Sequence, residues 1–530
     1  MRRAVALAVV AGLLASGCGN GESILNAGNE APDDGAPSVD TTPATAPPGD
    51  TLPPGESRPP GDTLSPGESG PPGDTVAPAT TLPPPTTTTI PLSEFAECPV
   101  DALDDASGTV RLTFWHGLNA ESEVGLVKLT DAYNASQERV QVDLENQGNY
   151  RQTIDKYVQS SQSSRPDLVM FPDYATQQTA DSDSVIPIGA CLEASAFDTS
   201  TFQPSTLTAY STAGVQFGMP FNVSNPVLYY NKKVFEAAGL DPELPPRTLD
   251  EVRQYSQQIV DTGAASFGLA IDSGTDSGGG WFLEQWFANA GELYADNGNG
   301  RLAPATRVLY DGPLGVELLT YVQQMINDGL IAYVGDNAGG SDTFLKIADR
   351  TSPAAMTIGT SAALGTVISA LGGGLIEGLT VDDIGVGPMP GPGPVPTALV
   401  GGAALYIVQD KGDEKAAAGW DYITYLVSPE SQSQFAVDTG YAPVRSDALD
   451  IEPVLTKYTT DPRFRVAYDQ LIGSPIDPAL RGPILGPQRE VRTVTASAVA
   501  EIFNGGDVQT ALSAAAAQAN LLIADYAARN

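Results

Sequence analysis

From residue 98 onward, short apolar runs alternate with segments in which apolar residues recur every three or four positions. The runs at residues 110–115, 140–144 and 168–171 have the length and character of strands. Strands that alternate with helices predict an α/β fold with helices on both faces of each sheet. Residues 98–530 exceed the size of one ordinary domain, so two lobes are expected. The apolar faces of the predicted helices consist of Leu126, Leu129 and Tyr133; Leu319, Val322 and Ile326; Trp420, Ile423 and Val427; and Ala515, Ala519, Leu522 and Tyr526.

The preceding segment has a different composition, rich in Pro, Gly and Thr. Such a composition offers too little apolar surface to form a core, so residues 18–97 are predicted to be a disordered, extended tether. Its expected role is to hold the folded part away from a membrane. The tetrapeptide Pro-Gly-Asp-Thr occurs three times and Pro-Gly-Glu-Ser twice, beginning at Pro48, Pro60, Pro72, Pro54 and Pro66.

The first residues have the pattern of an export signal. Two arginines at positions 2 and 3 precede an apolar run at residues 4–14, which is shorter than the roughly 20 residues that span a bilayer. Small residues follow, so residues 1–17 are predicted to be a signal peptide. Cys18 comes directly after them and resembles the acylated cysteine of a lipobox, although Leu14 lies one position earlier than usual. The sequence favours an exported chain anchored by lipid on Cys18; the alternative is an ordinary signal peptide with an incidental cysteine.

Two cysteines remain in the mature chain. An even pair in an exported protein is a candidate disulfide, so Cys98 and Cys191 are expected to be bridged. Two separate buried thiols are the alternative.

Charge and histidine content exclude several classes of function. The net charge of −37 excludes a nucleic-acid partner, because such proteins neutralise phosphates with basic patches. The chain contains a single histidine, His116. This argues against histidine-based zinc clusters and against Ser-His-Asp or Cys-His catalysis, which need histidine together with defined partner residues. His116 is interpreted as a hydrogen-bonded structural residue. No metal or cofactor is expected, and the protein is not expected to be an enzyme.

Several phrases match one family in number, order and spacing. The most distinctive is PFNVSNPVLYYNK at residues 220–232; GGAAL at 401–405 and TGYAP at 439–443 follow. Together they resemble the extracellular solute-binding proteins of carbohydrate ABC importers. Within that family, FWH at residues 114–116 and GNY at 148–150 are similar to the receptors for sn-glycerol 3-phosphate and glycerophosphodiesters.

This resemblance implies a type II-like periplasmic-binding-protein fold, with two α/β lobes, several crossing segments and a ligand cleft between the lobes that closes by a hinge motion. The expected crossings lie near residue 220, near 359–363 and just before 401. The implied partners are a small-molecule ligand and the membrane subunits of an ABC permease, and the receptor is expected to be a monomer. The expected lobes are residues 98–220 with 361–398, and residues 221–360 with 399–530.

The resemblance also implies a set of ligand contacts. Asp173, at the end of the strand at 168–171, is expected to accept ligand hydroxyls, although it also fits a helix N-cap. Arg492 is expected to bind a phosphate, with Arg481 and Arg489 as alternatives. Tyr150 taken alone is equally a packing residue, and Ser224 a turn residue. The full expected set is Tyr150, Asp173, Ser224, Trp281, Thr360, Ser361, Gly402, Tyr441 and Arg492.

The exact ligand stays open at this stage. Gly278 stands about where the glycerol-3-phosphate receptors carry a second Trp, which predicts a wider cleft and favours a glycerophosphodiester such as glycerophosphocholine over glycerol 3-phosphate. An oligosaccharide receptor of the same fold is the alternative binding function. A glycerophosphodiester hydrolase would need a metal or a histidine acid–base pair. A purely structural surface protein would not explain the segments that resemble the ligand cleft of the solute-binding family.

Overall fold

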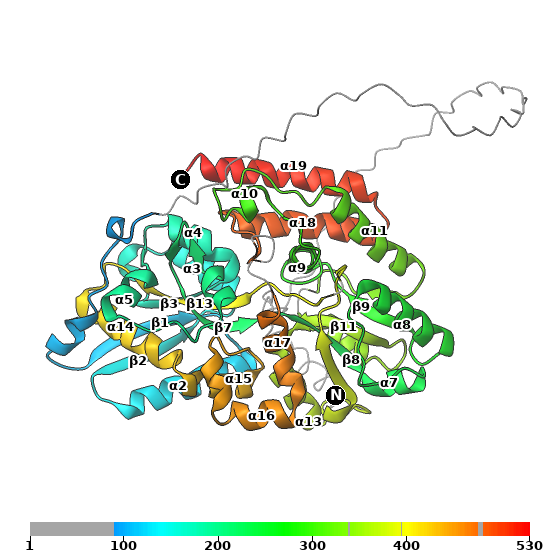
Figure 1. Cartoon of the computed structure of the whole chain (residues 1–530), viewed down its shortest axis with the longest axis horizontal. Helices are drawn as coiled ribbons and strands as arrows, with labels where there is room; N and C mark the ends of the chain where they lie inside the picture. Colours follow the sequence, from blue (N-terminus) through cyan, green and yellow to red (C-terminus); the bar gives the residue numbers. More distant parts are fainter. Residues whose placement is uncertain (1–89, 338–339, 394, 475–476, 478–480) are drawn as a thin grey trace, which may run out of the picture. The chain divides into compact units, whose positions relative to one another are not determined.

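A computed structural model describes residues 90–337, 340–393, 395–474, 477 and 481–530. The predicted signal peptide, the Cys18 lipidation site and the tether up to residue 89 lie outside the described residues. Two sheets with helices on their faces form the described part, which belongs to one compact unit (Figure 1). This arrangement confirms the predicted α/β class.

The first sheet contains the strands predicted at 110–115, 140–144 and 168–171. Strand β1 runs parallel to both of its neighbours β2 and β3, and β13 runs antiparallel to β3, β4 and β7. In order across the sheet, the strands are β2 (Val140–Asn146), β1 (Val110–His116), β3 (Leu168–Pro172), β13 (Gly401–Val408) and β4 (Val185–Ile186), with β7 (Met219–Ser224) also paired to β13.

The second sheet is built around β11, which runs parallel to β9 and antiparallel to β8. Strand β12 pairs antiparallel with the other edge of β8. In order, the strands are β10 (Ile331–Tyr333), β9 (Phe267–Ile271), β11 (Ala354–Thr360), β8 (Pro226–Asn231) and β12 (Ile384–Pro388). A separate small hairpin consists of β5 (Ser211–Thr212) and β6 (Val215–Gln216).

Helices cover both sheets, and the predicted apolar faces lie on them. In Figure 1, α18 and α19 run side by side at the top of the picture, above α9. The helices packed with the first sheet are α2 (Ala120–Ser136), α3 (Tyr150–Gln159), α4 (Thr176–Asp181), α5 (Ile188–Ser195), α6 (Pro204–Ala209), α14 (Asp413–Leu426) and α15 (Pro429–Thr439). The others are α7 (Lys232–Ala237), α8 (Leu249–Thr262), α9 (Trp281–Asn289), α10 (Asp296–Asn299), α11 (Pro313–Asn327), α12 (Asp342–Ile347), α13 (Leu364–Gly372), α16 (Val454–Thr460), α17 (Val466–Ile472), α18 (Gln488–Phe503) and α19 (Val508–Ala527).

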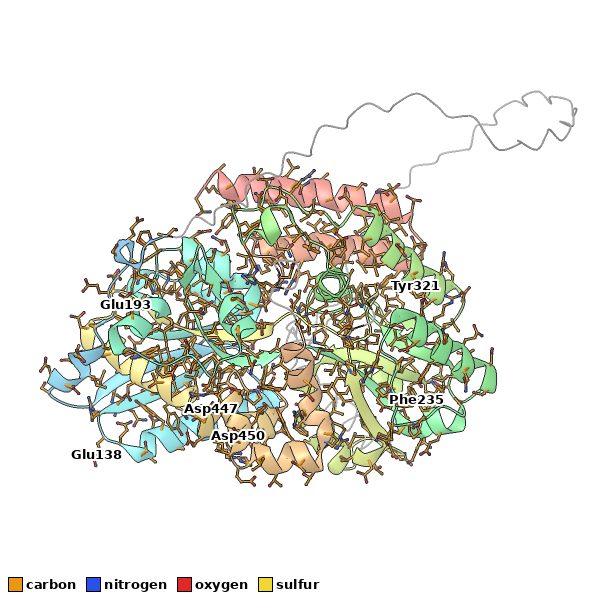
Figure 2. The ribbon with its side chains drawn as sticks, viewed as in Figure 1. Glu138, Glu193, Phe235, Tyr321, Asp447 and Asp450 are labelled. Atoms are coloured by element: carbon orange, nitrogen blue, oxygen red, sulfur yellow. A yellow bond between two sulfur atoms is a disulfide. The ribbon has the colours of Figure 1, made fainter. Side chains whose placement is uncertain are left out.

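Each sheet has its own core. Phe235 is fully buried in the core of the second sheet, where it stacks on Tyr230 with ring centroids 4.6 Å apart. Figure 2 shows Phe235 and Tyr321 on the side of the second sheet, and Glu138 and Glu193 on the side of the first. We refer below to the first lobe and the second lobe as the parts built on these two sheets.

The predicted division of the lobes is wrong after residue 360. Strand β12 was expected in the first lobe, but it pairs with β8 in the second sheet, from Ile384 opposite Asn231 to Pro388 opposite Val227. Strand β13 was expected in the second lobe, but it pairs with β3 in the first sheet. The cause is that the chain does not cross at 359–363; it turns back through α13 to the free edge of β8.

The first crossing lies at Asn225, five residues beyond the expected position. Residues 219–224 belong to the first sheet and residues 226–231 to the second, so the chain changes sheets at this one buried residue. The Asn225 side chain donates to the carbonyl oxygen of Ala467 and accepts from the Gln470 amide, each at 2.9 Å. These bonds fix the crossing where both sheets meet.

The predicted tether extends too far into the chain. Within residues 90–97, Ile90, Leu92 and Phe95 pack on the first lobe, and the Phe95 ring meets Phe217 edge-on at 5.4 Å. Cys98 follows directly and forms a disulfide with Cys191 in the first turn of α5. Among the described residues, no helix combines the length and the apolar character needed to cross a membrane.

Candidate functional site

A cavity of about 40 Å³ lies where the two lobes meet, and we call it the main cavity. Since one water molecule needs roughly 10–15 Å³, it has room for only a few. Seven of the expected ligand contacts line it, together with Pro172, Tyr174, Asp276 and Gly401. These seven are Tyr150, Asp173, Ser224, Trp281, Gly402, Tyr441 and Arg492.

Both lobes contribute walls to this cavity. In the first lobe, Asp173 comes directly after β3, Tyr150 begins α3 and Ser224 ends β7, so these side chains come from the ends of elements. In the second lobe, Trp281 begins α9 and Arg492 lies on α18. The placement fits the rule that ligands of α/β proteins bind at the carboxyl ends of strands.

Thr360 and Ser361 do not line the main cavity. The Thr360 carbonyl oxygen accepts from the Tyr229 hydroxyl at 2.7 Å, and the Thr360 hydroxyl accepts from the backbone N–H of Ala362. The Ser361 backbone N–H donates to the Asn225 carbonyl at 2.9 Å. These contacts hold the crossing at Asn225, which is a structural role.

Arg492 is clamped by a buried carboxylate that sequence reasoning missed. Its Nε and Nη2 each donate to one oxygen of Glu284 at 2.8 Å, which is a bidentate pair. Gln488 donates a third hydrogen bond to Glu284 at 2.9 Å. The side chains of Arg492 and Glu284 are only 4 % and 2 % exposed. The positive charge of Arg492 is therefore already matched inside the protein.

Arg492 also reaches two carboxylates of the cavity wall. Its Nη2 lies 3.4 Å from Asp173 Oδ2, and its Nη1 lies 3.5 Å from Asp276 Oδ1. Asp173 and Arg492 were expected on opposite sides of a ligand; in the structure they contact each other across the lobes. These contacts are longer than the Glu284 pair, so a ligand hydroxyl between them has both a donor and an acceptor to bind.

Three carboxylates surround one guanidinium here, and this affects their protonation. Burial raises the pKa of Asp173 to about 7 against the opposing charge of Arg492, and the charges of Glu284 and Asp276 add to the rise. Burial also raises the pKa of Asp276. Within the described part of the chain, no three His, Cys, Asp or Glu side chains are arranged to hold a metal ion.

The glycine-rich loop before α9 is tightly packed. A Cβ at Gly278 would lie 2.0 Å from the Asp272 carbonyl oxygen, so this position faces the loop's own backbone and does not line the main cavity. The expectation that a missing Trp at Gly278 widens the cleft is therefore not met. From this loop it is Asp276 that faces the cavity.

Gly401 allows the two lobes to approach closely. A Cβ on Gly401 would lie 2.4 Å from Cζ2 of Trp281, so the indole of the second lobe rests on the backbone of β13. Gly402 beside it has a φ of +97°, which favours glycine, and a Cβ there would meet the Asn222 carbonyl at 1.9 Å.

Neutral hydroxyl groups line the first-lobe side of the cavity. The Tyr150 hydroxyl accepts from Asn222 at 2.7 Å and lies 3.5 Å from the Tyr441 hydroxyl. Burial raises the pKa of Tyr150 well above its usual range, so this hydroxyl stays protonated. The Tyr441 ring stacks on Phe435 with centroids 5.6 Å apart. Together with Ser224, these residues offer O–H donors to a ligand.

A second, smaller cavity of about 20 Å³ shares Asp173 and Trp281 with the first, and we call it the arginine cavity because Arg301 and Arg481 line it. Glu284 also lines this cavity. Arg301 donates from Nε to the Gly482 carbonyl and from Nη1 to the Thr208 carbonyl, both at 2.8 Å. Burial and, to a smaller extent, the charge of Arg481 lower the pKa of Arg301 to about 9, against the opposing charge of Asp173.

Arg481 was one of the alternatives for the phosphate-binding cation. Its Nε is buried and has no hydrogen-bond partner among the described residues. The charge of Asp173, which lines the same cavity, partly offsets the lowering of the pKa of Arg301 by burial. The other alternative, Arg489, pairs with Asp155 at 2.5 Å and lines neither cavity. The arginine cavity thus brings two arginines together with the carboxylates of Asp173 and Glu284, next to the acidic wall around Arg492.

His116 lies away from both cavities. It is 1 % exposed, and burial lowers its pKa, which keeps the ring neutral. Its Nδ1 has no hydrogen-bond partner among the described residues.

The chain is similar in sequence to known solute receptors. It is 26% identical over 433 residues to the sn-glycerol-3-phosphate-binding periplasmic protein UgpB of Shigella flexneri serotype 5b, a match that covers 79% of this chain and 94% of that protein. UgpB of Escherichia coli strain K12 is also 26% identical over 433 residues, with the same coverage.

Solved structures of two-lobed solute-binding proteins share the fold. UgpB from Mycobacterium tuberculosis in complex with glycerophosphocholine superposes with a TM-score of 0.65 at 21% identity, covering 79% of this chain and 99% of that one. The cyclic alpha-maltosyl-1,6-maltose binding protein from Arthrobacter globiformis gives a TM-score of 0.62 at 22% identity, covering 78% and 99%.

The family model described as bacterial extracellular solute-binding protein matches residues 128–465, which include the second sheet and the first sheet except β1. This match extends over more than half of the chain. The chain belongs to the family of bacterial extracellular solute-binding proteins.

Proposed function

We propose that this protein captures a glycerophospho compound and delivers it to the membrane subunits of an ABC importer. The observation that carries the proposal is the contact between two unlike regions: the acidic wall with Asp173 and Trp281, and the arginine cavity with Arg301 and Arg481, which shares those two residues. A glycerophospho compound presents hydroxyls at one end and a phosphate next to them, so it matches both regions at once.

The hydroxyl end fits the main cavity. Asp173 accepts hydrogen bonds, Arg492 donates them, and the two lie 3.4 Å apart, so a glycerol hydroxyl can accept from one and donate to the other. Trp281 supplies an apolar surface for the carbon chain. The region carries more negative than positive charge, which suits neutral hydroxyls.

The phosphate end fits the arginine cavity. The Nε of Arg481 lacks a hydrogen-bond partner among the described residues. A phosphate oxygen would supply the acceptor and relieve the repulsion between the two arginines. In this respect the proposal departs from the expectation that Arg492 is the phosphate-binding residue.

Binding requires the lobes to move apart and close again. Cavities of about 40 and 20 Å³ are far smaller than the several hundred Å³ of a typical ligand site. Opening would separate Trp281 from Gly401 and Asp173 from Arg492, and closure around the ligand would restore the enclosed site. The closed form is the one we propose docks on the permease.

The location of the protein is part of the same proposal. Membership of an extracellular family supports export. We propose that residues 1–17 are removed as a signal peptide, that Cys18 is lipidated, and that the following segment tethers a monomeric receptor to the outer face of the cytoplasmic membrane. No catalytic step is proposed.

A sugar is the second candidate ligand. Acidic side chains beside aromatic ones, as Asp173 and Asp276 stand beside Trp281 and Tyr174, also suit the hydroxyls and ring faces of a saccharide. The fold is shared with a protein that binds cyclic alpha-maltosyl-1,6-maltose. A sugar would leave the arginine cavity unused, which favours the glycerophospho compound.

A thermal-shift screen of the folded chain separates these candidates. The ligands are glycerol 3-phosphate, glycerophosphocholine, maltose and trehalose, because a ligand that binds only the folded state raises the melting temperature. We expect a rise with a glycerophospho compound and none with the sugars. A rise with a sugar alone would contradict the proposed ligand class.

A further inference from the structure

Glu284 is a buried acid within WFLEQWF, the start of α9, in which Gln285 is the one other polar residue. It accepts three hydrogen bonds, two from Arg492 and one from Gln488, and it is 2 % exposed. Arg492 therefore has its Nε–Nη2 edge occupied by an internal partner. Only Nη1 and the remaining hydrogen of Nη2 point toward the cavity wall, where Asp276 and Asp173 lie.

The charges around Arg492 do not balance. Glu284, Asp173 and Asp276 together carry three negative charges when ionised, against the single positive charge of Arg492. A second anion brought to this end of the cavity would meet a net negative surrounding with little water to screen it. A neutral hydroxyl group would not be repelled by this negative charge.

We propose that Glu284 and Asp276 are specificity-determining residues that make the Arg492 end of the cavity select neutral hydroxyls and discriminate against ligands with two negative charges. Glu284 is a positioning residue for Arg492, and it also lines the arginine cavity in which we propose the phosphate binds. Asp276 faces the main cavity directly. This inference rests on the proposed function, since it concerns how one glycerophospho ligand is told from another.

The two kinds of glycerophospho ligand differ in charge. A phosphomonoester carries close to two negative charges above pH 7, because its second pKa is about 6, whereas a phosphodiester carries one. Arg301 and Arg481 accommodate the single charge of a diester. The extra charge of a monoester lies close to the acidic wall, because the arginine cavity shares Asp173 with it. The distribution of charge around the two cavities therefore favours phosphodiesters over phosphomonoesters.

The test compares ligand affinities by calorimetric titration at pH 8 and low salt. The ligands are glycerol 3-phosphate as the dianion, glycerophosphoglycerol as a singly charged diester, and glycerophosphocholine as a diester that also carries a cation. The proteins are the wild type, Glu284→Gln and Asp276→Asn. Glu317→Gln, on the exposed side of α11, is the matched control for the loss of one negative charge elsewhere.

The wild type is expected to bind both diesters more tightly than glycerol 3-phosphate. In Glu284→Gln and in Asp276→Asn, the affinity for glycerol 3-phosphate relative to glycerophosphoglycerol is expected to rise about tenfold. The ratio should not change in Glu317→Gln. A ratio of affinities is used because a merely structural loss would weaken both ligands together.

Two results would overturn the inference. One is a wild type that prefers glycerol 3-phosphate to both diesters. The other is an Asp276→Asn variant in which the affinity for glycerol 3-phosphate relative to glycerophosphoglycerol does not change. This variant removes a charge that faces the cavity, and it keeps the test possible if Glu284→Gln fails to fold. A wild type that binds none of the three ligands would overturn the proposed function and this inference with it. This outcome is distinguishable because it appears in the wild-type protein, before any variant is measured.

Discussion

Asp173 and Arg492 come from different lobes and contact each other at 3.4 Å in the main cavity. Asp173 directly follows β3 of the first sheet, and Arg492 lies on α18 beside the second. The contact is one of several polar links between the lobes on this side; Arg489 with Asp155 is another, at 2.5 Å. Ligand entry must break the Asp173 contact, so this pair couples the site to the motion of the lobes.

The raised pKa of Asp173 predicts a pH dependence of stability. The folded protein holds a proton at Asp173 up to about pH 7, whereas an unfolded chain releases it near pH 4. Between about pH 4 and 7 the free energy of unfolding should therefore fall as pH rises, by up to about 1.4 kcal/mol per pH unit from this group. Urea unfolding of the wild type and of Asp173→Asn across this range measures the effect.

The Asp173→Asn variant should have a shallower slope than the wild type, while Asp382→Asn, on the surface, should keep the wild-type slope. Equal slopes in all three proteins would contradict the buried, protonated state of Asp173.

Replacing Arg492 should destabilise the fold as well as the site. Arg492→Ala leaves Glu284 buried without its ion-pair partner, and breaking such a pair costs about 3–5 kcal/mol. The double variant Arg492→Met with Glu284→Gln should recover part of this loss, because it buries no unpaired charge. Chemical denaturation followed by circular dichroism gives both values; a loss below about 1 kcal/mol in the single variant would show that the pair is solvated.

A methyl group at Gly401 should weaken ligand binding. The Gly401→Ala variant places a Cβ within 2.4 Å of Trp281, so the indole must shift. Overpacking of this kind costs about 1–3 kcal/mol, and we expect the affinity for a glycerophospho ligand to fall about tenfold. Gly108→Ala is the control, because a Cβ there meets nothing within 4 Å. Equal affinities in the two variants would show that Trp281 has room to move.

The disulfide should stabilise the first lobe. It links Cys98 to Cys191 across 93 residues of chain, and loss of such a link typically costs about 2–5 kcal/mol. The Cys98→Ser and Cys191→Ser double variant should therefore melt at a lower temperature than the oxidised protein in differential scanning calorimetry. The reduced wild type should match the variant. Identical melting of all three forms would contradict a structural contribution from the bridge.

The sequence predicted the fold well where local pattern decides it, and less well where tertiary contacts do. The strands at 110–115, 140–144 and 168–171 follow from their apolar character, and the position of Asp173 at the end of the third follows from them. The exchange of β12 and β13 between sheets was missed, because both are short apolar strands whose partners are far away in the sequence.

In the candidate site too, the sequence predicted some residues and missed a contact that depends on the tertiary structure. Family phrases led to Tyr150, Ser224, Gly402 and Tyr441, which line the main cavity. The partner of Arg492 could not be read from spacing, because Glu284 lies 208 residues away in the chain. One signal was available: an acid inside the apolar segment WFLEQWF needs a buried partner.

The central claim is that a glycerophospho ligand places its phosphate in the arginine cavity beside the acidic wall. Its most direct test is calorimetric titration of glycerophosphocholine into the wild type and into Arg481→Ala, with Arg247→Ala as a control for the loss of an exposed arginine. We predict binding to the wild type and the control, and an affinity at least about tenfold weaker in Arg481→Ala. Equal affinity in all three proteins, or binding of maltose but not of glycerophosphocholine to the wild type, would contradict the account.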